Sequence, residues 1–367
     1  MNDSLNYKNI LIYRIGHLGD TLVSLPAFWT IRKIFPDARI TLLTNVDAQN
    51  AGYIAAQSVL PETGLFDDWL FYPNNLAKIK TVPAFLKLFR EIRRRKFDCL
   101  FYLMTRNRSV AQIQRDARFF KLAGIKKIFG IDYLLKNLIG DARLMRKPLP
   151  TIESESDFFL NTLAADNFQI DKNIKPAMLL GVAEKDFADE WLNKNCGAAL
   201  RENRLVAVAP GSKWNSKIWM EERFAEVVGR LIKQNDVFPV VFGGLEDREK
   251  GNRLVQYWQT GANAAGALNV RQSASALEKC RLYLGNDTGT MHLAASVGVS
   301  CVAVFAAIDL PNRWHPYGNN HTIFRTTVPC EGCHAPVCPF EKQCTTAIET
   351  DSVFAACARI LEQSEFD

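Results

Sequence analysis

The sequence predicts an α/β protein of two domains, each built around a mainly parallel sheet. Its 367 residues are too many for one ordinary core, and two domains of about 150–200 residues each would account for them. Hydrophobic residues make up 48% of the chain and charged residues 23%, as in globular proteins. Strand and helix patterns alternate in both halves, which is typical of parallel strands joined by helical crossovers.

Short apolar runs mark the predicted strands. In the first half they lie at Asn9–Tyr13, Arg39–Thr44, Asp98–Leu103 and Lys127–Gly130. In the second half they lie at Leu205–Ala209, Val237–Phe242, Leu282–Gly285 and Ser300–Phe305. Apolar residues at helical spacing follow the first strand and recur at Glu221–Gln234, Asp247–Gln259 and Asp351–Glu365.

The interdomain linker is predicted at Asp166–Leu180, which contains Pro176 and shows little periodicity. Residues 1–172 then form an N-terminal domain and residues 173–350 a C-terminal domain. Residues 351–367 form a last helix, for which we expect packing back on the N-terminal domain.

A glycine-containing loop follows the first predicted strand. Arg14 to Thr21 read Arg-Ile-Gly-His-Leu-Gly-Asp-Thr and lead into a helical pattern with Pro26 in its first turn or so. The spacing Gly-x-x-Gly-Asp is not the G-x-G-x-x-G of dinucleotide-binding folds, so NAD has little support. Asp20 has two interpretations that the spacing leaves open. It is either a helix N-cap, or a carboxylate at an interdomain cleft that takes a proton from an attacking hydroxyl.

The most informative loop reads Leu-Gly-Asn-Asp-Thr-Gly-Thr-Met-His-Leu, from Leu284 to Leu293. A strand, a tight glycine turn and a helix N-terminus succeed one another there, and unpaired N–H groups with the helix dipole favour an anion. Asp287 adds a carboxylate, and Thr288 and Thr290 add hydroxyls. The simplest ligand is a phosphate with sugar hydroxyls, although a plain strand–turn–helix junction has the same pattern.

Two further strand exits in the second half carry polar groups. In Pro210–Trp219, Lys217 stands where it can meet a phosphate as a point charge, and a surface lysine is the alternative. In Phe242–Asp247, glycines and acids follow a strand. A carboxylate there suits the two hydroxyls of a ribose, and the alternative is a helix with an acidic first turn.

Basic residues gather in one part of the first half, although the net charge is only +6. They lie just before and just after the predicted strand Asp98–Leu103, at Arg90, Arg93, Arg94, Arg95, Lys96, Arg106, Arg108, Arg115 and Arg118. A solvated helix face explains such a run. The sharper interpretation is a surface for an anionic acceptor or for the anionic inner membrane. Nucleic acid is not expected, because no nucleic-acid module accompanies the charge.

No membrane span or signal peptide is predicted. The longest uncharged run, Leu293–Ile308, is shorter than the roughly 20 residues of a spanning helix. Residues Met1–Asn6 lack the basic and apolar regions of a leader. We therefore expect a cytoplasmic protein, with the inner face of the cytoplasmic membrane as a second location, and its nine cysteines as thiols.

Taken in order, the four loops resemble those of the lipopolysaccharide heptosyltransferases, glycosyltransferase family 9. The motifs that carry the resemblance are Gly16-x-x-Gly19-Asp20, Gly211-Ser212 with Lys217-Ile218-Trp219, Phe242-Gly243-Gly244, and Asp287-Thr288-Gly289-x-x-His292-Leu293. The resemblance implies two Rossmann-like domains facing across a cleft, the GT-B architecture. It also implies an inverting, metal-independent transfer of a heptose or related sugar from an ADP-sugar to a lipopolysaccharide-core-type hydroxyl.

On this resemblance the acceptor side lies in the N-terminal domain. Asp20 would be the general base, with Gly19 beside it. Arg106 and Arg108 are acceptor candidates from their position after a strand. Their segment, Met-Thr-Arg-Asn-Arg, does not match the family residue by residue.

The resemblance places the donor in the C-terminal domain. Lys217 and the backbone of Thr288, Gly289 and Thr290 would stabilise the charge on the leaving diphosphate. Asp287 would lie beside the phosphate and sugar hydroxyls, Asp247 would hold the ribose and Ser212 would lie near a phosphate. His292 joins this group, with a structural role as the alternative.

No cofactor is expected, but the cysteines leave one question open. Cys330, Cys333, Cys338 and Cys344 supply enough ligands for a tetrahedral structural metal, although the second pair lacks C-x2-C spacing. A thiol loop packed by prolines is the plainer explanation.

Other functions remain open at this point. They are a transferase that uses another nucleotide sugar or a protein acceptor, a nucleotide-sugar epimerase, and a non-catalytic nucleotide-binding protein. The expected partners are a nucleotide-sugar donor and a glycolipid or other anionic glycan acceptor, with peripheral contact to the inner membrane.

Overall fold

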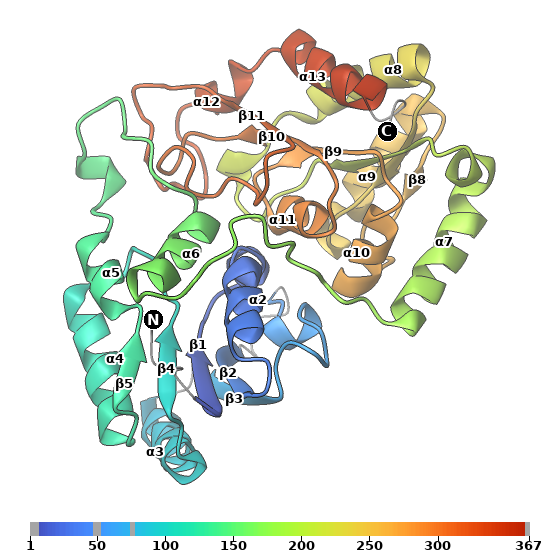
Figure 1. The fold of residues 1–367 in the computed structure, drawn as a ribbon. Helices are drawn as coiled ribbons and strands as arrows, with labels where there is room; N and C mark the ends of the chain where they lie inside the picture. The colour runs from blue at the N-terminus through green and yellow to red at the C-terminus, as the bar shows by residue number, and fades with distance from the viewer. Residues whose placement is uncertain (1–6, 47–52, 74–77, 364–367) are drawn as a thin grey trace. The chain divides into compact units, whose positions relative to one another are not determined.

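A computed structural model of the protein describes residues 7–46, 53–73 and 78–363 (Figure 1). The chain forms two compact units. Unit 1 comprises Met1–Gly140 and Glu155–Pro176, and unit 2 comprises Asp141–Ser154 and Ala177–Asp367. The second crossing lies inside the predicted linker. The excursion of residues 141–154 into unit 2 is not part of the predicted division at residues 172 and 173.

Unit 1 is a parallel sheet with strand order β3-β2-β1-β4-β5. Its strands are β1 (Asn9–Tyr13), β2 (Arg39–Val46), β3 (Asp68–Pro73), β4 (Cys99–Tyr102) and β5 (Lys127–Phe129). Its helices are α1 (Leu18–Leu22), α2 (Leu25–Ile34), α3 (Lys78–Arg95), α4 (Val110–Leu122), α5 (Ile131–Lys136) and α6 (Glu155–Ala165). The four predicted strands of this half are confirmed, to within two residues at each end.

Two features of unit 1 differ from the prediction. The edge strand β3 was missed, because its aromatic run Trp69–Tyr72 lies between two aspartates and a proline and has no clear alternation. The helical pattern after β1 is two helices rather than one. The first turn ends at Val23, and α2 begins anew with Pro26 at its second position, where a missing N–H costs little.

Aromatic rings fill the core of unit 1 beneath α2 and α6, which pack on each other. Phe101 of β4 stacks on Phe129 of β5 with ring centroids 5.1 Å apart, and Phe129 meets Phe168 edge-on at 4.9 Å. Phe35, at the end of α2, contacts both Phe101 and Phe168. These contacts pack the end of α2 on β4 and β5, and β4 is a neighbour of β1, where the first polar loop begins.

Unit 2 is a second parallel sheet, with strand order β11-β10-β9-β6-β7-β8. Its strands are β6 (Leu205–Ala209), β7 (Phe238–Val241), β8 (Ala262–Asn263), β9 (Leu282–Asn286), β10 (Cys301–Phe305) and β11 (His321–Arg325). Its helices are α7 (Val182–Arg201), α8 (Glu221–Asn235), α9 (Arg248–Trp258), α10 (Val270–Leu277), α11 (Gly289–Ser296), α12 (Gln343–Thr346) and α13 (Thr350–Gln363). The predicted strands are confirmed, and β8 and β11 are additional.

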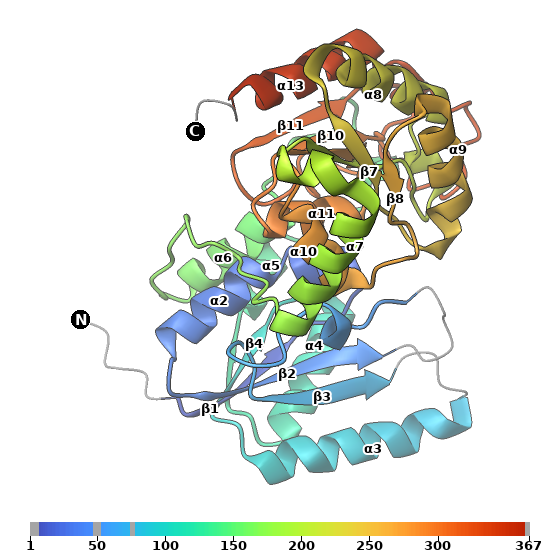
Figure 2. The ribbon, with the colours of Figure 1, turned by 90° about the vertical axis from the view of Figure 1, so that its right-hand side faces the viewer.

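Helices cover the sheet of unit 2, with α8 and α13 packed together and α7 against α10 (Figures 1 and 2). Trp219 and Phe224 are fully buried beneath α8, with ring centroids 5.1 Å apart. Val353 and Leu361 of α13 join the same core. Among the described residues, α13 packs chiefly on α8, β9 and β10 of unit 2.

The strand order of each sheet reverses at one point. In unit 1 the chain moves outward from β1 to β3 and then returns to the other side of β1 at β4. In unit 2 it moves from β6 to β8 and returns to the other side of β6 at β9. In open α/β sheets ligands bind at the carboxyl ends of the strands at such a reversal. The loops after β1, β6 and β9 are therefore the places where polar chemistry is expected.

No helix of the described residues is both long and apolar enough to cross a bilayer. The longest, α7 and α3, each carry several charged residues.

Candidate active site

Asp20 lies in α1, the short helix that follows the loop at the carboxyl end of β1. It occupies the third position of this short helix rather than the N-cap, which is His17. Its Oδ2 accepts the backbone N–H of His17 at 2.9 Å, and its side chain is 24% exposed. The carboxylate thus closes the helix start and still reaches solvent, so it is available for proton transfer.

A buried arginine, Arg14, bonds both the backbone and the side chain of Asp20. Arg14, only 3% exposed, donates from Nη2 to the backbone oxygen of Asp20 at 2.8 Å and to its Oδ1 at 3.3 Å. Its Nε also donates to Ser24 Oγ at 2.8 Å, and its guanidinium lies over the ring of Phe159 at 4.8 Å. Because the guanidinium is held by several groups, it fixes both the backbone and the side chain of Asp20.

Gly16 makes room for that carboxylate. A Cβ at Gly16 would overlap the side chain of Asp20. The Gly16 N–H donates to Asn45 Oδ1 at 2.8 Å, which ties the loop after β1 to the end of β2. The predicted Gly16-x-x-Gly19-Asp20 motif is therefore a compact turn in which Gly19 belongs to α1.

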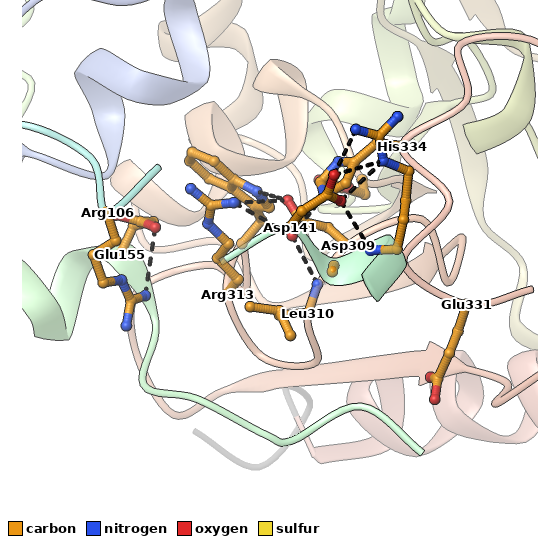
Figure 3. Close-up of polar contacts among 12 residues, drawn as sticks. Arg106, Asp141, Glu155, Asp309, Leu310, Arg313, Glu331 and His334 are labelled. Carbon is orange, nitrogen blue, oxygen red and sulfur yellow. Dashed lines mark hydrogen bonds and ion pairs between the residues drawn. The ribbon is translucent and has the colours of Figure 1, made fainter. Parts of the chain in front are cut away.

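The two predicted acceptor arginines are both held by carboxylates of unit 1. Arg106 is 3% exposed, lies over the ring of Phe158 and pairs with the fully buried Glu155 at 3.4 Å (Figure 3). Arg108 pairs with Asp116, which also accepts the hydroxyl of Tyr102 at 2.9 Å. The sequence position after β4 did not reveal this, because the carboxylate partner of Arg106 is 49 residues away along the chain.

In unit 2 the loops after β6 and β9 bring a lysine and a carboxylate together. Lys217 Nζ lies 2.6 Å from Asp287 Oδ2, although the two residues are 70 positions apart. The Asp287 side chain is 8% exposed and that of Lys217 21% exposed. The positive charge thus remains accessible beside the N-terminus of α11, where the first backbone N–H groups have no helical partner.

Asn286, which the sequence analysis did not single out, joins the two loops. It is fully buried, and its Nδ2 donates to the backbone oxygens of Pro210 and Gly211 at 3.0 and 3.2 Å. Its Oδ1 accepts the N–H of Trp219 at 3.0 Å. An asparagine at the end of a buried apolar run, between Gly285 and Asp287, is the sequence signal that could have identified it.

Asp247 lies between the exits of β6 and β7, in a space that only glycines leave open. A Cβ at either Gly211 or Gly243 would overlap its carboxylate. The N–H of Gly244 donates to its Oδ2 at 3.2 Å. Burial, followed by the nearby charge of Glu246, raises the pKa of Asp247 above its usual value of 3.8. The protein therefore holds a carboxylate here at some cost to its stability.

Asp247→Asn is expected to raise Tm at pH 7.5, and the gain should shrink as the pH falls toward 4. A raised pKa means that folding favours the protonated carboxyl, so the penalty for the charged form is present at neutral pH and absent below the pKa of the unfolded chain. Thermal unfolding followed at both pH values measures this. Glu249→Gln, an exposed change in the first turn of α9, the helix that Asp247 precedes, should show no such gain. A lower Tm for Asp247→Asn at pH 7.5 would mean that its charge stabilises the start of α9.

The remaining predicted donor residues surround the start of α11 and the loop after β6. Thr288 is the N-cap of α11, followed by Gly289 and Thr290. The Thr288 hydroxyl lies beside that of Tyr283, whose pKa is raised by burial. His292 is 6% exposed, inside the helix. Ser212 Oγ accepts the N–H of Trp214 at 3.3 Å, which shapes the turn ahead of Lys217.

His315, in the loop after β10, is a second residue that the sequence analysis did not single out. It is partly buried, with its ring 5.3 Å from that of Phe305. Burial lowers the pKa of His315 below 6.5, while the negative charge of Asp287 acts in the opposite direction. The histidine therefore lies within electrostatic reach of the Lys217–Asp287 pair. Its place far along the chain gave no motif to recognise.

The cysteine-bearing segment packs on residues 141–154 of the same unit. Glu331 accepts the N–H of Leu149 at 2.6 Å and pairs with Arg325 at 3.1 Å. Asp309, near the end of β10, forms an ion pair with Arg313, with Oδ2 and Nη1 3.1 Å apart (Figure 3). Its Oδ1 lies 3.8 Å from Nε2 of His334. Within the residues described, no three His, Cys, Asp or Glu side chains are placed to hold one metal ion, and this includes the four clustered cysteines.

Sulfur atoms of this segment accept hydrogen bonds instead. Cys338 Sγ accepts the backbone N–H groups of Phe340 and Lys342 at 3.4 and 3.3 Å. Gln343 Nε2 donates to Cys330 Sγ at 3.2 Å. Cys344 is buried beside Ala307 and Ile308, and Cys333 packs against the same cluster. In these contacts the thiols accept hydrogen bonds or pack against apolar neighbours.

Comparison with known proteins identifies the family. The sequence model of glycosyltransferase family 9 (heptosyltransferase) matches residues 85–344, more than half of the chain. Over 330 residues the chain is 25% identical to the lipopolysaccharide core heptosyltransferase OpsX of Haemophilus influenzae. The aligned region covers 85% of this chain and 82% of that relative.

Solved structures show the same fold. A family 9 glycosyltransferase of Veillonella parvula has a TM-score of 0.73 at 20% identity, with 98% of this chain and 99% of that one covered. The Escherichia coli heptosyltransferase WaaC, solved with ADP, has a TM-score of 0.64 at 14% identity, with 96% and 99% covered. The two parallel sheets correspond to the two Rossmann-like domains of GT-B proteins. The chain therefore belongs to glycosyltransferase family 9, the heptosyltransferases, and is a glycosyltransferase of the GT-B fold.

Proposed function

We propose that the protein is an inverting, metal-independent heptosyltransferase that moves a heptose from ADP-heptose to a hydroxyl of a lipopolysaccharide-core-type acceptor. The family and the OpsX relative support the acceptor class. The donor is suggested by Escherichia coli WaaC, whose solved structures hold ADP and ADP-2-deoxy-2-fluoro heptose. The observation that carries the proposal is the Lys217–Asp287 pair beside the N-terminus of α11.

Asp20 is the proposed general base. The acceptor oxygen forms a new bond to the anomeric carbon while its proton passes to the Asp20 carboxylate. The bond from the anomeric carbon to the diphosphate breaks, and its electron pair leaves with ADP. Attack opposite the leaving group inverts the anomeric configuration. The contacts from Arg14 and from the His17 N–H support this role, because they hold a solvent-accessible carboxylate in one orientation.

Lys217 is proposed to meet the diphosphate as negative charge develops on it. Its ammonium bonds Asp287, which directly precedes the N-cap of α11, and we propose that it acts together with the first backbone N–H groups of that helix to supply the positive potential that a divalent ion supplies elsewhere. Asp287 keeps the lysine in place and borders the sugar hydroxyls. No cofactor enters this scheme. Ser212 and Thr288 would lie near the phosphates, Asp247 would accept the ribose hydroxyls, and His292 would support α11 from inside.

On the acceptor side, we propose that Gly19 lines the approach to Asp20. Arg106 and Arg108 are proposed to shape the loop after β4 rather than to bind the acceptor, because Glu155 and Asp116 hold their guanidinium groups. A lipopolysaccharide-core acceptor is carried by a lipid, so the enzyme is expected to work at the inner face of the cytoplasmic membrane.

A thermal-shift panel with ADP, UDP, GDP and CMP, each with and without EDTA, is expected to show a selective rise in Tm with ADP that survives EDTA. A ligand at 100 times its Kd stabilises the fold by about 2.7 kcal/mol, which such a panel resolves. Selectivity for UDP would retain the transferase and change its donor. No shift with any nucleotide would contradict the donor-site assignment of Lys217, Asp247 and Asp287.

The nature of the acceptor is tested by product mass. Incubation with ADP-heptose and a heptose-free lipopolysaccharide core should add one heptose to the glycolipid. Addition of heptose to a protein instead would favour the alternative acceptor class. Donor turnover without any acceptor would favour an epimerase.

A further inference from the structure

The exposed side of α3 combines apolar and basic residues on one stripe of the helix. Val82, Leu86, Arg90 and Arg93 are spaced by four, four and three residues, so they lie on the same face. Val82 is 63% exposed and Leu86 48% exposed, and both arginines are exposed. The N-terminal half of the stripe is therefore aliphatic and the C-terminal half cationic.

The opposite side of α3 is already used in packing. Leu88 and Ile92 are buried, and the ring of Phe85 meets Tyr72 of β3 edge-on at 5.0 Å. α3 packs against β3 within unit 1 and runs beside it in Figure 2. Since this side holds the helix in place, the exposure of Val82 and Leu86 is not a consequence of a poorly packed helix.

A second basic helix, α4, packs beside α3. The ring of Phe119 in α4 lies 5.7 Å from that of Phe89 and 6.3 Å from that of Phe85. Arg118 and Lys121 of α4 are exposed, and Leu122 at the end of the helix is 71% exposed. The basic face, as we call it, comprises Lys87, Arg90 and Arg93 of α3 with Arg118 and Lys121 of α4.

The charge of the basic face is not neutralised by its neighbours. Each of the two helices contains a single acid, Glu91 in α3 and Asp116 in α4. Glu91 is bonded by Arg94 and Arg95, and Asp116 by Arg108 and Arg115. In the parts of the chain that the structure describes, the five cations of the basic face pair with no carboxylate. The face therefore attracts anions at several points together.

We infer that this face binds the surface of a bilayer that contains anionic phospholipids. Cations at the level of the lipid phosphates, with aliphatic side chains just below them, are the pattern of helices that lie in a membrane interface. A soluble polyanion would use the cations, but it would leave Val82 and Leu86 without a partner. Binding to the bilayer is inferred from the basic face alone. Only its biological purpose, access to a lipid-carried acceptor, rests on the proposed function.

Sedimentation with vesicles tests the inference on the full chain without any donor. The protein should bind vesicles of phosphatidylcholine with about one-third phosphatidylglycerol and not those of phosphatidylcholine alone. The double variant Arg90→Glu/Arg93→Glu should bind at least about 25-fold more weakly, since each cation near the surface contributes about fivefold. Leu86→Asp should also weaken binding, through loss of the inserted side chain and through repulsion.

The matched control is Lys185→Glu/Lys194→Glu, which makes the same charge change on exposed positions of α7 in unit 2. It should retain binding. Equal loss in the control would assign the effect to net charge and overturn the inference, as would wild-type protein that binds neither vesicle or both alike. Loss with the arginine variant but none with Leu86→Asp would indicate a soluble polyanion instead. An unchanged Tm excludes misfolding of the variants. The ADP thermal shift is read separately, so failure of the proposed function would leave the lipid result standing.

Discussion

Asp20→Asn is expected to lower the rate of sugar transfer by about 10²–10⁴-fold while donor affinity is retained. The asparagine keeps the size of the side chain, and its oxygen can still accept the N–H of His17, which now bonds Oδ2 at 2.9 Å. It cannot take up a proton from the acceptor hydroxyl. The change therefore removes the proposed base and leaves the turn after β1 intact. Steady-state transfer rates and calorimetric binding of ADP measure the two effects.

Asp37→Asn is the matched control, because Asp37 is an exposed aspartate of the same unit that follows α2. Its activity should equal that of wild type. Unchanged activity of Asp20→Asn would exclude Asp20 as the base. If neither wild type nor Asp20→Asn transfers sugar, and the substitution leaves the biological role unchanged, a non-catalytic nucleotide-binding protein would be favoured.

Lys217→Ala is expected to lower kcat at saturating donor by about 10²–10³-fold, the usual loss when one preorganised group that stabilises developing charge is removed. The rate should be the same with EDTA as without it. Lys217→Arg keeps the positive charge but changes its geometry, so we expect an intermediate rate. Loss in kcat rather than in KM alone would show that the lysine acts on the leaving diphosphate rather than on ground-state binding.

Stability must be measured on the same variant, because Lys217→Ala leaves Asp287 enclosed without its cation. The double variant Lys217→Ala/Asp287→Asn removes that unpaired charge. It should recover Tm but not activity. Lys233→Ala, an exposed lysine of α8 that bonds no described carboxylate, should change neither. Full recovery of activity in the double variant would mean that the lysine acts only on the fold.

Local sequence determined most of the fold. Strands buried on both faces are short apolar runs, so β1, β6 and β9 could be located from residue type alone. Strands without such a run were missed. β11 is only partly buried along its whole length, and β8 has two residues. Their existence depends on pairing with β10 and β7, which no local pattern encodes.

The residues of the candidate site, like the strands, could be predicted only in part from the local sequence. The positions of its loops could be predicted because glycine, aspartate and threonine favour turns and helix starts at the ends of strands. Their partners could not. Asn286 lies within the Leu284–Leu293 loop but was not singled out, and His315 stands in no motif. The contacts of both residues depend on the packing of loops that are distant in sequence.

The sequence by itself determined the two α/β units and the strands that lead to the loops of Asp20, Lys217 and Asp287. Only the tertiary structure decided which groups meet. It brought Lys217 to within 2.6 Å of Asp287, enclosed Arg106 with Glu155, and carried residues 141–154 into unit 2. The reason is physical. Periodicity and turn chemistry act over a few residues, whereas an ion pair across 49 or 70 residues depends on how whole strands and helices pack.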